Sequence, residues 1–149
     1  MSADNEQIVR RVFKDLFNKG NLAVADEIIA ANHVNHDPAT PDFGKGPDGE
    51  KQIVTLYRGA FPDLQFKIVQ MIEGEEYVTT RYTATGTHKG VLRGIAPTSK
   101  TVTVEGIVIN RISRGKIVDS WVIWDALGMM QQLGAVPAME EKAKGQAAK

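Results

Sequence analysis

The chain has 149 residues, 42% of them hydrophobic, and its 18 lysines and arginines balance its 18 aspartates and glutamates. Because neither sign forms a long run, the sequence lacks the electrostatic footprint of a protein that binds nucleic acid or an anionic membrane, and a small apolar molecule is the expected partner. The absence of cysteine excludes disulfides, thiolate metal sites and a cysteine nucleophile.

The first half of the sequence predicts three helices, over about residues 5–19, 22–29 and 48–60. Apolar residues recur at helical spacing in each, which gives each helix one face to bury. Gly20 ends the first helix and Pro47 opens the third, as these residue types commonly do. Residues 31–37 are long enough only for an edge strand or the entry to a loop. Residues 37–49 hold three prolines and three glycines and predict a mobile loop.

The second half changes to the alternating period of antiparallel strands. We expect strands over about residues 64–72, 77–88, 101–112 and 117–125. Residues 89–100 mix glycine and proline with the exposed-looking Val91, Leu92 and Ile95, a composition that we expect at the rim of a hydrophobic cavity. Helices followed by a meander of strands predict an α+β fold, in which a strongly bent sheet closed by three helices forms a cone with a central pocket.

The two ends of the chain predict no membrane or targeting segment. The N-terminus lacks the apolar stretch of a signal peptide, and no apolar run approaches the roughly 18 residues of a membrane span, which favours a cytoplasmic protein. The length fits a single domain over residues 1–137. Residues 138–149 are small and charged, and we expect them to form a disordered tail.

Asp125 stands where the last strand passes into a final helix that ends at Gly134. In a strand, Trp121, Ile123 and Asp125 share a face, so the carboxylate points the same way as an indole and a branched aliphatic side chain. Two interpretations are open. Asp125 either caps the final helix or works as a general acid or base in an apolar pocket, where desolvation would disfavour its charge.

Six segments, read in order, resemble the SnoaL-like polyketide cyclases, or ester cyclases, of the nuclear transport factor 2-like (NTF2-like) superfamily: HVNHDP, AFPDL, TGTHKG, APTSK, GKIVDSW and WDALGMMQQLG. The resemblance runs from the first helix to about Gly134. It implies the cone-shaped fold described above, often as a homodimer that packs the outer sheet faces together. It also implies chemistry without metal or organic cofactor, in which an aspartate at the end of the last long strand is the acid and base of an intramolecular aldol condensation.

The resemblance places that aspartate on Asp125 and the histidines of its H-D-P and T-H-x-G motifs on His36 and His88. Those cyclases have a histidine on the strand before the acid, where this sequence offers Glu105 and Arg111 as the nearest polar side chains. We expect Asp125 and His36 to be catalytic. We expect five further residues to contact a substrate: His88, Trp121, Tyr57, Glu105 and Tyr82. Each has a structural alternative, a hydrogen bond within its own loop for the histidines and ordinary core packing for the aromatic residues.

The leading hypothesis is an enzyme that removes a proton α to a carbonyl of an apolar compound, as an aldol-type cyclase, an isomerase or a lyase. The alternatives are a non-catalytic module that binds a small hydrophobic ligand and a dimeric scaffold of the same fold. We expect no metal site, because His33 and His36 point to opposite faces of an extended segment. An outward face with Val122 and Trp124 would need a cover and would favour a homodimer.

Overall fold

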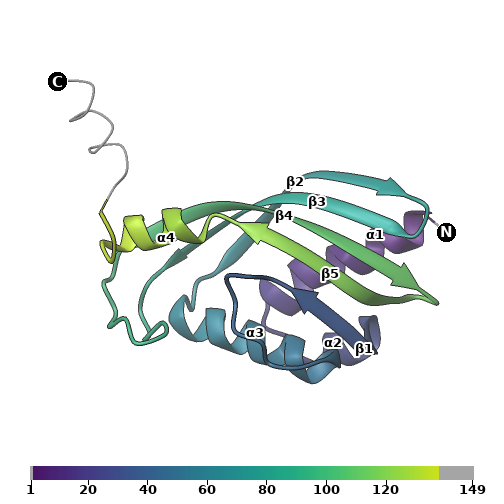
Figure 1. Cartoon of the computed structure of the whole chain (residues 1–149), viewed down its shortest axis with the longest axis horizontal. Coiled ribbons are helices and arrows are strands. Elements are labelled where there is room, and N and C mark those ends of the chain that lie inside the picture. The colour runs from purple at the N-terminus through teal and green to yellow at the C-terminus, as the bar shows by residue number, and fades with distance from the viewer. Residues whose placement is uncertain (1, 138–149) are drawn as a thin grey trace.

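The computed structural model describes residues 2–137, and in it helices pack along one side of a curved sheet (Figure 1). The predicted tail at 138–149 lies outside the described residues. The elements in chain order are α1 (Ser2–Arg11), η1 (Val12–Phe17), α2 (Ala23–Ile28), β1 (Ile29–His36), α3 (Gly46–Ala60), β2 (Gln65–Gly74), β3 (Tyr77–Thr87), β4 (Thr101–Ser113), β5 (Lys116–Trp124) and α4 (Ala126–Leu133). This order confirms the predicted α+β fold.

The predicted first helix is α1 continued by η1, a π-helical segment in which the N–H of Asn18 donates to the carbonyl of Phe13 at 2.9 Å. Val9, Phe13 and Leu16 are buried against the sheet. The π-helical turn widens the helix where its aromatic residues meet the sheet, a local feature that hydrophobic spacing alone does not reveal.

The five strands form one sheet in the order β1-β5-β4-β3-β2. Neighbouring strands are antiparallel except β1, which runs parallel to β5 at the edge of the sheet. The stretch predicted as an edge strand or loop entry is therefore a true edge strand. Because β1 lies beside β5, the loop that follows it is placed next to the end of the last long strand (Figure 1).

A β-bulge in β5 changes which side chains face the interior. Arg111 of β4 pairs with Asp119, but Ile112 pairs with Ile117, so Val118 is an extra residue on β5. Ile117 and Ser120 are both buried although they stand three positions apart, which in a regular strand would place them on opposite faces. Alternation therefore changes phase at Val118, as it does at such bulges.

As a result, Val122 and Trp124 face the interior, while Trp121 and Ile123 lie on the outer face with 39% and 67% of their surface exposed. The prediction that Trp121 and Ile123 face the pocket, with Val122 and Trp124 outside, is wrong. The outer face nevertheless carries an apolar patch, because Ile109 pairs with Trp121 and Ile107 with Ile123 on adjacent strands.

The loops that follow β1 and β3 are joined by a hydrogen bond. Arg93 of the β3–β4 loop donates from Nη1 to the carbonyl of Ala39 in the β1–α3 loop at 2.7 Å. In the β3–β4 loop, Leu92 is buried in the core rather than exposed, and only Val91 projects as expected. No helix in the part of the chain that the structure describes is long and apolar enough to cross a membrane.

Candidate active site

An internal pocket of about 130 Å³ lies between the inner face of the sheet and the helices η1 and α3. Most of its wall is aliphatic or aromatic and includes Phe13, Phe17, Phe61, Phe66, Val104 and Val122. At about 10–15 Å³ of such volume per water, the space holds roughly ten water-sized groups. This is the concave, largely apolar setting in which small organic molecules bind.

Asp37 brings a carboxylate to this pocket from the loop after β1. Its Oδ2 accepts hydrogen bonds from the Thr40 hydroxyl at 2.6 Å and from the indole N–H of Trp124 at 3.1 Å, and its Oδ1 accepts from the N–H of Ala39 at 2.9 Å. The Tyr57 hydroxyl lies 2.8 Å from the Thr40 oxygen and must donate to it, because the Thr40 hydrogen goes to Asp37. Three donors thus stabilise the negative charge of Asp37.

Glu50 is the second carboxyl group in the wall of the pocket. It stands on the first turns of α3, and Ile53 and Tyr57, three and seven residues further on, also line the pocket. Its Oε2 is buried and has no hydrogen-bond partner. Burial, followed by the charge of Asp37, raises the pKa of Glu50 to about 7.

Tyr82 places a phenol against the same pocket from β3. Its ring packs between Phe13 and Phe66, with ring centroids 5.4 and 5.1 Å away. A side chain at Gly106, its partner on β4, would collide with the phenol, so the glycine makes room for it. Burial raises the pKa of Tyr82, and the phenol is a neutral hydrogen-bond donor.

Asn110 and Ser120 form a further polar spot on the sheet side of the pocket. The Ser120 hydroxyl donates to Oδ1 of Asn110 at 2.6 Å, so His33 Nε2, 2.9 Å from the same hydroxyl oxygen, is the donor in their bond. Burial lowers the pKa of His33 to about 4, and its ring is neutral at physiological pH. His33 does not line the pocket itself, but its hydrogen bond orients the Ser120 hydroxyl, which does.

Asp125 lies outside the pocket. It is exposed, and its Oδ1 accepts from the N–H of Gly128 at 2.8 Å as the N-cap of α4. The capping interpretation is therefore confirmed, whereas the predicted position on the pocket face is wrong. The physical reason is the bulge at Val118, which turns Trp124 inward and Asp125 outward.

His36 and Trp121 also lie away from the pocket, on the outer face of the sheet. Their rings stack with centroids 5.2 Å apart and an angle of 9° between their planes. His36 Nε2 is 3.2 Å from Oδ1 of Asp119, whose Oδ2 accepts from Arg111 at 3.1 Å. The position of His36 does not support its predicted catalytic role, because its ring at the end of β1 lies on the solvent side of the sheet.

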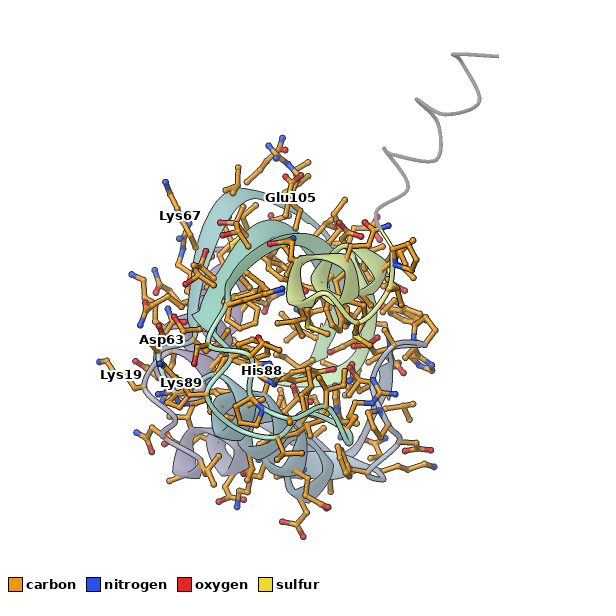
Figure 2. All side chains as sticks on the ribbon, turned by 90° about the vertical axis from the view of Figure 1, so that its left-hand side faces the viewer. Lys19, Asp63, Lys67, His88, Lys89 and Glu105 are labelled. Carbon is orange, nitrogen blue, oxygen red and sulfur yellow. The ribbon has the colours of Figure 1, made fainter. Side chains whose placement is uncertain are left out.

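Glu105 and His88 are likewise absent from the residues that line the pocket. Both are labelled in Figure 2, where Glu105 lies at the outer surface of the sheet. Glu105 lies on the outer side of the sheet, 3.8 Å from Arg81, because odd-numbered residues of β4 point outward. His88 is fully buried beside Phe61, and its Nδ1 accepts from the N–H of Thr98 at 3.2 Å. The structure supports the loop-stabilising alternative for His88.

Of the seven predicted site residues, Tyr57 and Tyr82 are the two that the structure places in the pocket wall, and their contact with a substrate stays a prediction. Sequence reasoning missed Asp37, Glu50 and Trp124. Glu50 had a usable sign, since it is a carboxylate within the apolar stripe of an amphipathic helix. Within residues 2–137, no group of three or more histidines and acids is placed to hold a metal ion.

Comparisons with known proteins agree with this architecture. Residues 7–133 match the family model of SnoaL-like polyketide cyclases. The chain is 32% identical over 121 residues to the nogalonic acid methyl ester cyclase of Streptomyces nogalater, covering 79% of this chain and 89% of the relative.

Solved structures show the same fold. TsrD from Streptomyces laurentii superposes with a TM-score of 0.81 at 22% identity, over 90% of this chain and 97% of TsrD. A Catenulispora acidiphila protein with a ketosteroid isomerase-like fold superposes with a TM-score of 0.73 at 15% identity, over 85% of this chain and 92% of its own. The predicted NTF2-like fold is confirmed.

Proposed function

The chain belongs to the SnoaL-like polyketide cyclase family, and from this premise we propose that it binds an apolar carbonyl compound in the internal pocket and closes a ring by intramolecular aldol condensation without a cofactor. One observation carries the proposal: the apolar pocket is lined by two carboxyl groups, and none of its lining residues is lysine, arginine or histidine. Carboxyl groups that lie in an apolar pocket without a basic residue to neutralise them are suited to transferring a proton to or from a bound ligand.

An intramolecular aldol condensation requires only a few functional groups from the protein. A hydrogen on a carbon between two carbonyl groups is already acidic, so a positioned carboxylate is a sufficient base. The aromatic wall excludes water from the enolate, and the neutral phenol of Tyr82 is a donor for a developing oxyanion. The space suits a reacting portion of about ten non-hydrogen atoms, with the rest of a larger substrate extending beyond it.

The proposal also includes a homodimer. The outer face of the sheet carries an apolar patch that we call the outer patch: Ile107, Ile109, Trp121 and Ile123. Apolar side chains gathered on an open sheet face favour a cover, and a second copy of the chain provides a matching one. This surface lies on the opposite side of the sheet from the pocket, so assembly leaves the pocket free.

The first experiment is thermal unfolding of the protein with bicyclic ketones, β-keto esters and polycyclic phenols, followed by incubation with each stabilising compound. Binding to the folded state raises the unfolding temperature in proportion to ligand concentration and affinity. We expect carbonyl compounds to stabilise the protein and at least one dicarbonyl compound to be cyclised. Stabilisation without turnover would favour a binding module, and no stabilisation by any compound would contradict the proposal.

A further inference from the structure

We infer that Glu50 is the group that takes and returns the proton in the pocket, and that Asp37 is the fixed negative charge beside it. The inference rests on the proposed function and names its acid and base. It differs from the expectation drawn from the sequence, which gave this role to Asp125. The carboxyl groups of Glu50 and Asp37 share one pocket, whereas Asp125 is an exposed cap outside it.

The hydrogen bonds of the two pocket acids assign them different roles. Both oxygens of Asp37 are held by donors, at distances from 2.6 to 3.1 Å. Glu50 has a buried Oε2 without any donor. A carboxylate that is fully hydrogen-bonded keeps its charge, while an unsatisfied one beside it binds a proton readily. Glu50 is therefore the acid free to exchange a proton with a ligand.

Glu50 is half-buried as a residue, and tight backbone packing surrounds the turn of α3 that carries it. The loop before α3 packs so closely on the first turn of the helix that any side chain at Gly49 would collide with the carbonyl of Gly44. Gly46 is also close to β1, since a Cβ at this position would lie 2.7 Å from the carbonyl oxygen of Ala31. These contacts seal the N-terminal end of α3 and fix the Glu50 carboxyl on a packed helix. A catalytic group on a rigid element keeps its geometry better than one on a loop.

The charged side chains on the elements next to the pocket have ion-pair or hydrogen-bond partners of their own. Lys51 on α3 pairs with Asp26 of α2 at 2.8 Å, and Asp15 of η1 pairs with Lys19 at 3.4 Å. Arg93, from the β3–β4 loop, donates to the carbonyl of Ala39 and also interacts with the Tyr57 hydroxyl in the pocket wall, although it does not line the pocket. No basic residue lines the pocket, so none neutralises the acid pair there.

The other titratable groups near the pocket do not change charge near neutral pH. Burial raises the pKa values of Tyr57 and Tyr82 and lowers that of His33 to about 4, so all three are neutral. Burial and the charge of Asp37 raise the pKa of Glu50 to about 7. A general base is most effective when its pKa lies near the working pH, and Glu50 meets that condition.

The reaction balances with Glu50 alone as proton carrier. Its carboxylate removes a proton from a carbon α to a carbonyl, which leaves an enolate. The enolate carbon attacks a second carbonyl carbon of the same molecule, so that one C–C bond forms as the C=O π bond breaks. The resulting alkoxide takes the proton back from Glu50. No electrons leave the substrate, and the protein ends in its starting state.

The test uses 2-tetralone, a bicyclic ketone of about the size of the pocket. Exchange of its α hydrogens in D₂O, followed by NMR, reports proton abstraction directly. We expect the wild type to accelerate exchange and Glu50→Gln to lose about 100-fold or more of that acceleration. Asp48→Asn, on the same helix but exposed, is the matched control and should retain it, as should Asp125→Asn.

The outcomes separate the inference from the proposed function. If 2-tetralone shifts the unfolding temperature and the wild type exchanges its hydrogens, but Glu50→Gln does so equally well, only the inference fails. Loss of exchange in Asp125→Asn with full activity in Glu50→Gln would return the role to Asp125. If 2-tetralone and the other carbonyl compounds do not bind the wild type at all, the proposed function fails. Binding without exchange by the wild type overturns both.

A pH profile tests the role of Asp37. The exchange rate of the wild type should rise with pH through about 7, as Glu50 ionises. Asp37→Asn removes a negative charge that raises the Glu50 pKa, so the rise should move to lower pH. A purely structural defect would lower the rate without moving the midpoint. An unchanged midpoint in folded Asp37→Asn would overturn the assigned role of Asp37.

Discussion

The indole N–H of Trp124 donates to Oδ2 of Asp37 at 3.1 Å across 87 residues of sequence. The bond ties the end of β5 to the loop after β1, two segments that the parallel pairing of β1 and β5 brings together. The edge of the Trp124 indole also meets the Tyr57 ring, with centroids 5.9 Å apart. The last strand therefore supplies the pocket with a donor that fixes an acid, rather than with the acid itself.

Trp124→Phe should destabilise the protein more than Trp121→Phe. The first removes a donor from the charged Asp37, and losing a partner of a buried charged group costs about 1–3 kcal/mol. The second changes a half-exposed ring on the outer face, where substitutions usually change the free energy of unfolding by less than about 1 kcal/mol. Urea denaturation of the two variants measures the difference. Equal losses would mean that the bond to Asp37 contributes little.

Val122→Phe and Ile123→Phe test the phase of β5 directly, because the two residues are adjacent and face opposite sides of the sheet. The larger ring at position 122 enters the pocket and should abolish the rise in unfolding temperature caused by 2-tetralone. The same ring at position 123 lies outside and should leave it intact. Circular dichroism confirms that both variants are folded. The reverse result would mean that β5 presents its other face to the pocket.

Stability should fall as pH rises through the range in which Glu50 ionises. Its pKa is about 7 in the folded protein and 4.5 as its ordinary value, so the folded state binds the proton more tightly. The stabilisation is fully present below pH 4.5 and is lost as the pH rises through 7, by at most about 3 kcal/mol. Glu50→Gln should remove this loss and be more stable than the wild type at pH 8.

His33 acts in the opposite direction, and its effect has to be separated from that of Glu50. Its pKa is lowered from 6.5 to about 4, so its contribution is present above pH 6.5 and is lost as pH falls toward 4. Free energies of unfolding measured at pH 4.5, 6 and 8 for wild type and Glu50→Gln separate the two, because His33 is common to both. A constant difference between the proteins at all three values would contradict the raised pKa of Glu50.

The proposed homodimer predicts that Ile123→Lys is monomeric. A lysine in the outer patch places a charge where the second copy would bury apolar surface, and burying an unpaired charge is strongly unfavourable. Sedimentation equilibrium of wild type and variant gives their masses. Lys116→Ile, at an exposed end of the same strand and outside the outer patch, is the control and should leave the mass unchanged. A monomeric wild type would refute the dimer.

Periodicity was sufficient to predict most helices and the antiparallel strands, but not the π-helical segment or β1. Helical spacing between breakers such as Gly20 and Pro47 located the helices, and alternating residues located the strands of the antiparallel meander, because each has one face to bury. The helix that ends at Gly134 was found in the same way.

The site could be predicted only in part. Residues 117–124 carry large apolar side chains on both faces, so hydrophobic alternation did not show which face was inner. The bulge at Val118 then changed which side chains point inward, and no glycine in the strand indicated that a bulge was present. Asp37 was missed because, within the H-D-P motif, a role was assigned only to the neighbouring His36. Its place in the pocket depends on the pairing of β1 with β5, a contact between distant segments that local patterns do not encode.

The extra residue at Val118 also governs how roles may be carried from one relative to another. Deleting it would turn the following half of β5 inside out, sending Trp121 and Ile123 into the pocket and Val122 and Trp124 to the solvent. In a chain without the bulge, the positions of β5 that face the solvent here would face the pocket. Aligned residues of β5 therefore face the same side of the sheet only in chains that share the bulge.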